Sequence, residues 1–570
     1  MTGVKAMKLR DKKKAFAAMA LIALVTFQAG SARGDDTAAE ARLKQLEQKV
    51  AKQERKQKET EARVPTAPPP GIVCKDAPCP PPPPPAFVAF TNGLKVESFD
   101  HDFSFKIGGR IFVDGGVSTQ PVQAFAGRPP FFPAHAASGF SNQVGFRQAR
   151  LQVEGKAFRD WEYKFQYDFV GSPNDLIVGG IRDAYVAWRY FEPVTFQVGN
   201  FFEPNSLERT NSSLYRDFIE RALASDLLAG SRHVGLAAVT GGAVPGLVGN
   251  SNWSAKGGIF STSLEDGAPV APTVNAAGAV TNGGIPAGNS SFLNPVAGGH
   301  QYWDAVGRLT YAPILSKDSL LHLGGSVRYQ KPNDATAASD DRVLQPGSTL
   351  KSEANILNEN LLGTQPLTCV AATAQLVGQN CVKDFLGYGA ELVAAYGPFA
   401  VQAEYLGTHS DRDPGLLAFF NSGGLHAPGG TSLNFSGYYV YATWYLTGDS
   451  RAEAYHSYPE EFNAPATFGQ IKILHPVSAG GIGAWEVAAR FSEINLNDGS
   501  VLFAQPVGAR PNIQGGRQAD FTLGLNWYPD KGIRFMANWV NVLQLAAPFN
   551  RPDLNGIHPN LFELRAQVNW

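Results

Sequence analysis

Lysine and arginine side chains recur on one face of a series of predicted strands. Side chains alternate between the two faces of a strand, so residues two positions apart point the same way. On the face opposite the aromatic side chains, the candidate basic residues are Lys106, Arg110, Arg150, Lys164, Arg189, Arg328, Arg490, Arg534 and Arg565. Acidic residues share this face, among them Glu154, Asp168, Glu486, Asp520 and Glu563.

This charged face has two interpretations, and both stay open at this point. One is a mixed wall that holds water and pairs opposite charges across neighbouring strands. The other is a basic track along which anions exchange their water of hydration for guanidinium contacts. Alternation says which face a residue lies on but not where it lies around a closed sheet.

The chain shows no arrangement typical of a catalytic or metal-binding site. Its ten histidines are scattered and form no His-Glu-x-x-His pattern. The pair Gly108-Gly109 falls within a predicted strand, where a bulge explains it better than a phosphate cradle. We therefore expect no catalytic residue, no metal ligand and no cofactor, with a barrel enzyme kept as an alternative class.

A second group of basic residues lies in the connection 202–230, which is amphipathic and partly helical in pattern. A loop with apolar residues packs them against another surface, and the interior of a barrel is available. Arg209, Arg216 and Arg221 would then narrow the opening and charge it. The alternative is a cap over the mouth of the sheet.

The elements that position these charges are strands of alternating character. The clearest runs from Trp161 to Phe169, and the chain ends in the same way, from Leu561 to Trp570. Sixteen such segments lie near 103–116, 145–158, 161–170, 181–190, 194–201, 231–240, 252–261, 301–312, 319–331, 385–396, 399–409, 434–447, 483–493, 517–528, 532–543 and 561–570.

Repetition of this pattern predicts an all-β fold, a sixteen-stranded antiparallel transmembrane β-barrel. Within lipid every backbone N–H and C=O group has to be paired, and among sheets only a closed one does this. A ring of about sixteen strands also leaves an aqueous lumen, whereas a ring of about eight is filled by its own side chains.

The connections between these strands alternate between tight turns and long segments. Arg159-Asp160 and Gly397-Pro398 are tight, whereas 262–300 and 332–384 are long. Bacterial outer-membrane barrels have short periplasmic turns and longer outer loops, so we expect both ends of the barrel on the periplasmic side. The segment 448–482 would be a periplasmic turn, yet it is long, and alternation does not explain it.

Three segments are expected before the barrel, which we place at residues 99–570. Residues 1–32 combine a basic start, an apolar stretch and small residues, the plan of a secretory signal peptide. Residues 33–64 carry Leu43, Leu46 and Val50 at heptad positions and predict a short periplasmic helix with a weak coiled-coil seam. Residues 65–98 include Pro80 to Pro85 and predict a stiff Pro-rich linker.

The charge balance argues against a nucleic-acid partner. Residues 1–32 hold six Lys or Arg residues and one Asp, and the rest of the chain has 43 basic and 49 acidic residues. A chain with a net negative charge is not attracted to phosphate backbones as a whole. Any preference for anions would have to be local.

Several segments together resemble the phosphate-selective porin O/P family. They are 198–204 (Val-Gly-Asn-Phe-Phe-Glu-Pro), 218–223, 445–451, 483–492, 522–528 and 534–538. The resemblance spans about 100–570 and implies a trimeric porin of the bacterial outer membrane whose inward loop and basic ladder favour anions. It also implies that the long turn opening at Leu446-Thr447-Gly448 is a family feature. Phe202 stands where members of the family often have a lysine.

The expected function is thus a water-filled channel for passive diffusion of small solutes, anions such as phosphate among them. The expected partners are outer-membrane lipid, small anionic solutes and two further copies of the chain, with the N-terminal arm in the periplasm. Alternatives are a non-selective general-diffusion porin, a barrel enzyme and an envelope tether that uses the helix and the Pro-rich linker.

Four cysteines lie in two close pairs, Cys74 with Cys79 and Cys369 with Cys381. In an exported protein such pairs are disulfide candidates. We expect Cys369 and Cys381 to form a disulfide within an outer loop, with a stabilisation of roughly 2–3 kcal/mol in the chain-entropy model. Peptide mapping without reductant should recover the two peptides joined; two free thiols would contradict the pairing.

Overall fold

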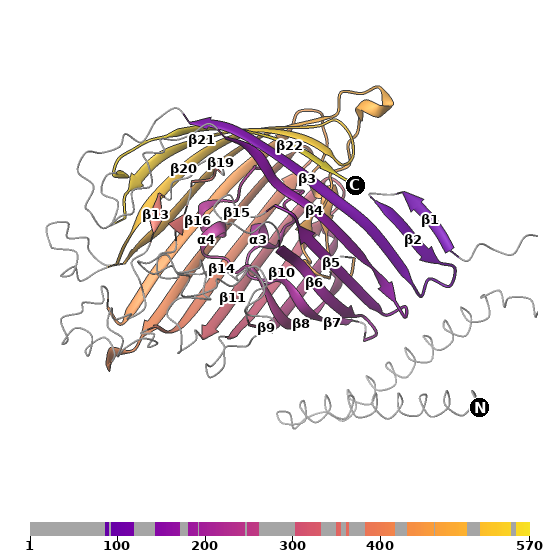
Figure 1. Ribbon diagram of the computed structural model, residues 1–570, viewed down its shortest axis with the longest axis horizontal. Helices are drawn as coiled ribbons and strands as arrows, with labels where there is room; N and C mark the ends of the chain where they lie inside the picture. The colour runs from indigo at the N-terminus through magenta and orange to yellow at the C-terminus, as the bar shows by residue number, and fades with distance from the viewer. Residues whose placement is uncertain are drawn as a thin grey trace, which may run out of the picture. The chain divides into compact units, whose positions relative to one another are not determined.

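The structure is a computed structural model (Figure 1). It describes residues 86–90, 93–118, 143–170, 180–191, 193–245, 248–261, 303–331, 349–350, 352–354, 361–363, 382–415, 430–460, 462–498, 513–548 and 554–570. The four cysteines, the predicted signal peptide and the predicted N-terminal helix lie outside these residues.

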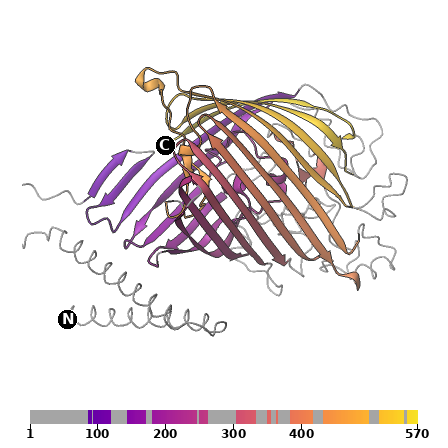
Figure 2. The same ribbon diagram turned by 180° about the vertical axis from the view of Figure 1, so that it is seen from behind.

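Antiparallel strands form one closed barrel, shown from both sides in Figures 1 and 2. The last strand pairs with the first strand of the ring, from Leu561 opposite Ser118 to Asn569 opposite Arg110. All sixteen predicted strands are confirmed: β3 (Ser104–Ser118), β4 (Gln143–Ala157), β5 (Trp161–Asp168), β6 (Gly180–Trp188), β7 (Val194–Phe202), β8 (Arg232–Pro245), β9 (Val248–Phe260), β10 (Trp303–Leu315), β11 (Ser319–Lys331), β14 (Val382–Tyr396), β15 (Phe399–Arg412), β16 (Ser432–Tyr445), β19 (Ala484–Asp498), β20 (Ile513–Tyr528), β21 (Ile533–Ala546) and β22 (Asn560–Asn569).

Alternation along each strand separates an apolar exterior from a polar interior. In β16, for example, exposed and buried side chains alternate, with Tyr438, Val440 and Trp444 outside and Tyr439 and Tyr441 inside. The exposed side chains of the other strands are also mostly large and apolar. An apolar exterior around a closed ring of paired backbone is the arrangement that lipid requires.

Aromatic rings gather on the outside at the end of the barrel that carries the short turns. Trp161 stacks on Trp188 with ring centroids 5.5 Å apart, and Trp485 stacks on Trp527 at the same distance. Phe399, beside the Gly397-Pro398 turn, stacks on Trp444. Amphipathic rings at this level are typical of the girdle at a membrane interface.

Two strands that were not predicted precede the ring. β1 (Ala86–Phe90) and β2 (Leu94–Ser98) form a hairpin, and β2 pairs with the start of β3. They lie within residues 65–98, which the sequence assigned to the linker, so the sheet begins before Phe99. The missed signal is Asn92-Gly93, a dipeptide typical of tight hairpins, and Gly93 has a φ of +115°.

Short elements complete the described part of the chain. They are α3 (Leu207–Thr210), α4 (Leu223–Leu227), β12 (Thr349–Leu350), β13 (Leu362–Gly363), η1 (Ala452–Ala454), β17 (Tyr455–His456), β18 (Thr467–Phe468) and η2 (Val477–Ala479). Among the described residues, no helix is both long enough and apolar enough to cross a membrane.

An apolar core lies inside the ring, between α4 and the wall. Leu223 and Leu227 of α4 cluster with Phe435 of β16, Ile494 of β19 and Val540 of β21. The close approach requires a glycine, because a Cβ at position 437 would lie 2.9 Å from the Cβ of Ala224. The connection between β7 and β8 therefore packs into the barrel and does not cap its mouth (Figure 1).

The lipid-facing position of Leu523 can be tested by substitution. Leu523 is 41% exposed on β20, four residues from the girdle residue Trp527. We expect Leu523→Arg to lower the free energy of unfolding from lipid vesicles by about 2–4 kcal/mol, because the charge would lie deep in hydrocarbon. Val568→Arg, at the level of the girdle, is the control and should cost at most about 1 kcal/mol. Equal losses for both variants would contradict this orientation of the barrel.

Candidate pore constriction

The connection between β7 and β8, residues 203–231, is held inside the ring by a carboxylate of the opposite wall. Glu404 of β15 accepts hydrogen bonds from the backbone N–H groups of Leu207 (2.7 Å) and Glu208 (3.0 Å) at the start of α3. It also accepts from the hydroxyl of Tyr439 at 2.6 Å. The first N–H groups of a helix lack partners within the helix, so a carboxylate at this point satisfies them. We call residues 203–231 the inward loop.

Arg490 of β19 is a second anchor of the inward loop. Its guanidinium contacts Glu353 at 2.5 Å and Glu208 at 3.5 Å, and it donates to the backbone oxygen of Glu220 at 3.0 Å. It also lies over the ring of Phe218, 4.3 Å from the centroid. Glu353 belongs to the connection between β11 and β14, so two connections meet on one buried arginine.

The long turn 448–482 also folds into the ring, which explains its length. Arg308 of β10 donates to the backbone oxygens of Pro465 (2.8 Å) and Ala466 (3.2 Å) in this turn. Phe468 of this turn donates its backbone N–H to the side-chain oxygen of Asn211 in the inward loop at 3.0 Å. Arg451 of the turn forms an ion pair with Asp217 of the same loop. We call residues 448–482 the inserted turn.

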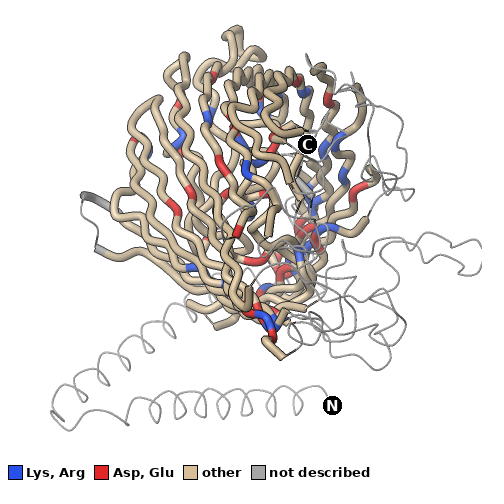
Figure 3. Tube along the Cα trace, turned by 90° about the vertical axis from the view of Figure 1, so that its left-hand side faces the viewer, with Lys and Arg blue, Asp and Glu red and all other residues tan. Residues whose placement is uncertain are grey.

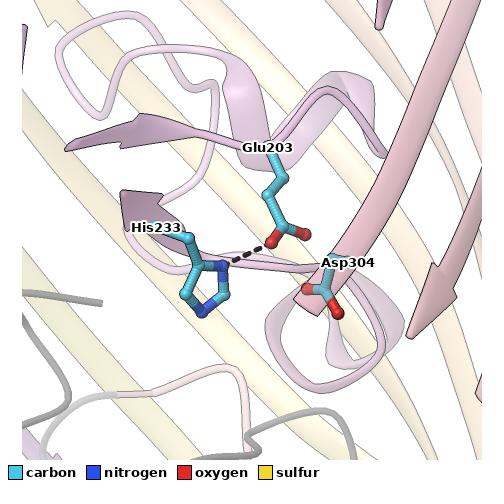
Figure 4. A group of neighbouring side chains, drawn as sticks. All are labelled: Glu203, His233 and Asp304. Carbon is cyan, nitrogen blue, oxygen red and sulfur yellow. Dashed lines mark hydrogen bonds and ion pairs between the residues drawn. The ribbon is translucent and has the colours of Figure 1, made fainter. Parts of the chain in front are cut away.

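A buried cluster joins the start of the inward loop to the wall (Figure 4). Glu203 contacts His233 of β8 at 2.5 Å, and Asp304 of β10 lies beside them. These three residues are close enough to hold a metal ion. Arg328 of β11, however, lies 2.9 Å from Glu203 and 2.5 Å from Asp304. A guanidinium already neutralises both carboxylates, so the cluster is an ion-pair network that fixes the loop.

Between the inward loop, the inserted turn and the barrel wall, a cavity of about 970 Å³ remains open inside the ring. Its lining contains twelve basic residues and three acidic ones. The basic residues are Lys106, Arg110, Arg147, Arg150, Lys164, Arg182, Arg209, Arg216, Arg221, Arg232, Lys472 and Lys531, and the acidic ones are Glu154, Asp183 and Asp530. Charged residues follow the strands of the barrel and the segments inside it (Figure 3).

Ion pairs neutralise part of this positive charge but not all of it. Arg150 pairs with Asp168, and Arg232 pairs with Asp183, each at 2.7 Å. In contrast, Nε and Nη1 of Arg216, which is 4% exposed, have no hydrogen-bond partner among the described residues. Burial lowers the pKa of the Arg216 guanidinium to about 10.

Arg221 is in a similar position. Burial, together with the neighbouring Arg216 and Arg209, holds the pKa of its guanidinium well below the ordinary value. Arginine nevertheless stays charged near neutral pH. An anion that approaches crowded, buried guanidinium groups lowers their free energy, because it supplies the missing countercharge.

The structure places seven of the predicted residues around the cavity. They are Lys106, Arg110, Arg150 and Lys164 of the wall and Arg209, Arg216 and Arg221 of the inward loop. Arg110 donates to the hydroxyl of Ser213 in that loop at 3.1 Å, which joins the two groups.

The other five predicted pore-lining residues do not line this cavity. Arg328 and Arg490 are buried in the networks described above. Arg565 is buried against Asp114 at 2.7 Å, and Arg189 binds Glu162 at 2.8 Å. Arg534 borders a small separate pocket of about 20 Å³. Alternation places all five inside the ring, but it does not show which part of the lumen the connections fill.

Two of the missed cavity residues follow from irregularities in the strands. The pairing of β3 with β4 shifts so that Gln148 and Phe146 oppose consecutive residues, which leaves Arg147 in a bulge. The bulge turns Arg147 inward, where it binds Glu220 at 2.9 Å. A similar shift in the pairing register between β5 and β6 lies beside Arg182. Strict alternation predicts neither residue.

A closed barrel with a lipid-compatible exterior and a charged, open cavity inside defines an outer-membrane channel of the porin class. The chain matches the model of the family described as phosphate-selective porin O and P over residues 123–570, and it belongs to this family. Its location is therefore the bacterial outer membrane. The resemblance found in the sequence is confirmed.

Among its relatives, Porin O of Pseudomonas aeruginosa is 24% identical over 464 residues, 81% of this chain and 88% of that protein. An uncharacterised protein of Caulobacter vibrioides is also 24% identical over 476 residues, 83% of this chain and 76% of that protein. A solved anion-selective porin from Comamonas acidovorans is 11% identical, with a TM-score of 0.41 over 82% of this chain and all of that one.

The anchoring role of Glu404 can be tested by truncation. Glu404→Ala leaves the buried donors of α3 and Tyr439 without an acceptor, and we expect a loss of about 1–3 kcal/mol in the free energy of unfolding. Current through single channels should also become noisier as the inward loop loosens. Glu493→Ala, which removes a half-exposed pair with Arg517, is the control and should cost at most about 1 kcal/mol. A quiet channel of unchanged stability in Glu404→Ala would contradict the anchor.

Proposed function

We propose that this chain forms a water-filled channel through which small anions, phosphate among them, diffuse passively across the outer membrane. The observation that carries this proposal is the excess of basic over acidic residues around the open cavity, twelve against three. It favours a basic track over an evenly mixed wall. Outside the cavity, Arg308, Arg451, Arg490 and Arg565 are held in buried ion pairs.

Passage requires that an anion bind and also leave. Guanidinium groups along the cavity replace part of the hydration shell of the anion as it enters. The paired carboxylates Asp168 and Asp183 lower the local potential, so an anion is not held at a single site. Arg110, Arg216 and Arg221 bring wall and inward loop together, and we place the strongest anion contact there.

Selectivity is expected to depend on the arginines of the inward loop. In a bilayer with a KCl gradient, the reversal potential of the unmodified channel should indicate a preference for chloride. Arg216→Glu with Arg221→Glu should shift it towards potassium, because both side chains line the cavity. Arg517→Glu is the control: Arg517 pairs with Glu493 and is absent from the cavity lining, so the change should have little effect.

Three results would count against the proposal. A reversal potential near zero for the unmodified channel would indicate a non-selective general-diffusion porin. An unchanged potential after reversal of both loop charges would place the selective contact elsewhere in the lumen. Absence of conductance steps would revive the alternatives of a barrel enzyme or an envelope tether.

The N-terminal arm belongs to this proposal as a periplasmic element of a homotrimer. Its predicted seam is too short to associate by itself, so the outer walls of the barrels are expected to hold the trimer. Deletion of residues 33–85 leaves the hairpin β1–β2 intact and should preserve trimers and conductance with some loss of thermal stability. Analytical ultracentrifugation in detergent checks this, and monomers would show that the arm sets the oligomeric state.

A further inference from the structure

The open cavity has an apolar side as well as a basic one. Besides its charged residues, the lining includes a group of apolar side chains from the inward loop and the inserted turn. We call this group the apolar wall: Leu214, Phe468, Ile471, Ile473 and Pro476. Apolar side chains offer no favourable contact to a hydrated inorganic ion.

The apolar wall is fixed in place by the barrel. Ile471 is buried in a cluster with Tyr445, Ala484 and Tyr528, at the ends of β16, β19 and β20, and Ile473 packs against the same cluster. The backbone of Leu214 accepts a hydrogen bond from Gln567 of β22 at 3.1 Å. The apolar wall is therefore preformed, with Ile471 and Phe468 buried in its base and Leu214, Ile473 and Pro476 partly exposed.

The two sides of the cavity come from different arcs of the ring. Arg150, Lys164, Arg182 and Arg232 lie on β4, β5, β6 and β8. When the strand pairings are followed around the closed barrel, β16, β19 and β20 lie across from β6, β7 and β8. A solute in the cavity thus has the basic groups of β4, β5, β6 and β8 on one side and Ile471 and Ile473 of the apolar wall on the other.

Apolar and positive surface also adjoin at Phe202. Its half-buried ring lines the cavity, and the guanidinium carbon of Arg232 lies 3.8 Å from the ring centroid. Arg221 lies 6.0 Å from the same centroid. An aromatic solute could contact this ring and the flat face of a guanidinium at once.

We propose that the channel prefers organic anions with an apolar flank, such as aryl phosphates, over hydrophilic anions of the same charge. This inference rests on the proposed anion channel and names the solute class of that same cavity. The anionic group lies against the basic side, and the apolar flank displaces water from the apolar wall. A cavity of this size falls within the range of about 300–1,000 Å³ typical of small-molecule sites.

Block of chloride current by two phosphate monoesters tests the proposal. Phenyl phosphate and methyl phosphate carry the same charge at pH 8 and differ only in the flank. In planar bilayers containing the full mature chain, phenyl phosphate should half-block the current at a concentration about fivefold lower than methyl phosphate, as expected for burial of part of a ring.

Variants identify the surface responsible. Leu214→Asn with Ile473→Asn should abolish the difference between the two esters and leave the block by methyl phosphate unchanged. Leu474→Asn is the matched control, because Leu474 adjoins Ile473 but is 46% exposed and does not line the cavity. It should keep the fivefold difference.

Equal half-blocking concentrations in the unmodified channel would overturn the inference while leaving anion selectivity intact. So would a preference for phenyl phosphate that survives the double substitution. If the reversal potential shows no anion preference at all, the proposed function itself fails. The proposed preference for anions with an apolar flank then fails with it.

Discussion

The pairing of β22 with β3 is the contact on which the interior of this protein depends. It joins the two ends of the described ring, and Trp570 and Gly109 continue it with two further backbone hydrogen bonds. In lipid each unpaired backbone group costs several kcal/mol, so an open sheet has no stable form there. Closure also fixes the number of strands, and a ring of this size is wider than its own side chains can fill. The connections between the strands therefore have to fill the rest of the lumen.

What fills the lumen also decides which charges remain available. A buried charge without a partner is strongly destabilising, so arginines beneath the connections pair with carboxylates such as Glu353 and Asp304. Where the connections leave space, on the side of β3 to β8, basic residues outnumber acidic ones. The chain as a whole is close to neutral. Its local potential arises from the distribution of ion pairs and not from net charge.

The sequence predicts the ring well because alternation is a local property. Every strand of the ring follows from its own residues, as in Trp161 to Asp168, and tight turns such as Gly397-Pro398 follow from the residues between two strands. The lining of the cavity was predicted only in part. Arg147 is turned inward by a bulge, and bulges are set by pairing with a neighbour. Arg490 and Arg565 lie inside as predicted, yet connections distant in sequence cover them. The hairpin β1–β2 was hidden in a Pro-rich context despite its Asn-Gly signal.

The contact between the inward loop and the inserted turn has a consequence for assembly. Asn211 and Asp217 belong to a connection at one end of the barrel, and Phe468 and Arg451 to a turn at the other. Two segments that start on opposite sides of a membrane meet only after the strands between them have crossed it. These contacts inside the channel thus form only after the strands β8 to β16, which lie between the two segments, are in place. A barrel that has closed but has not yet joined these segments would be a wider and less selective channel than the mature one.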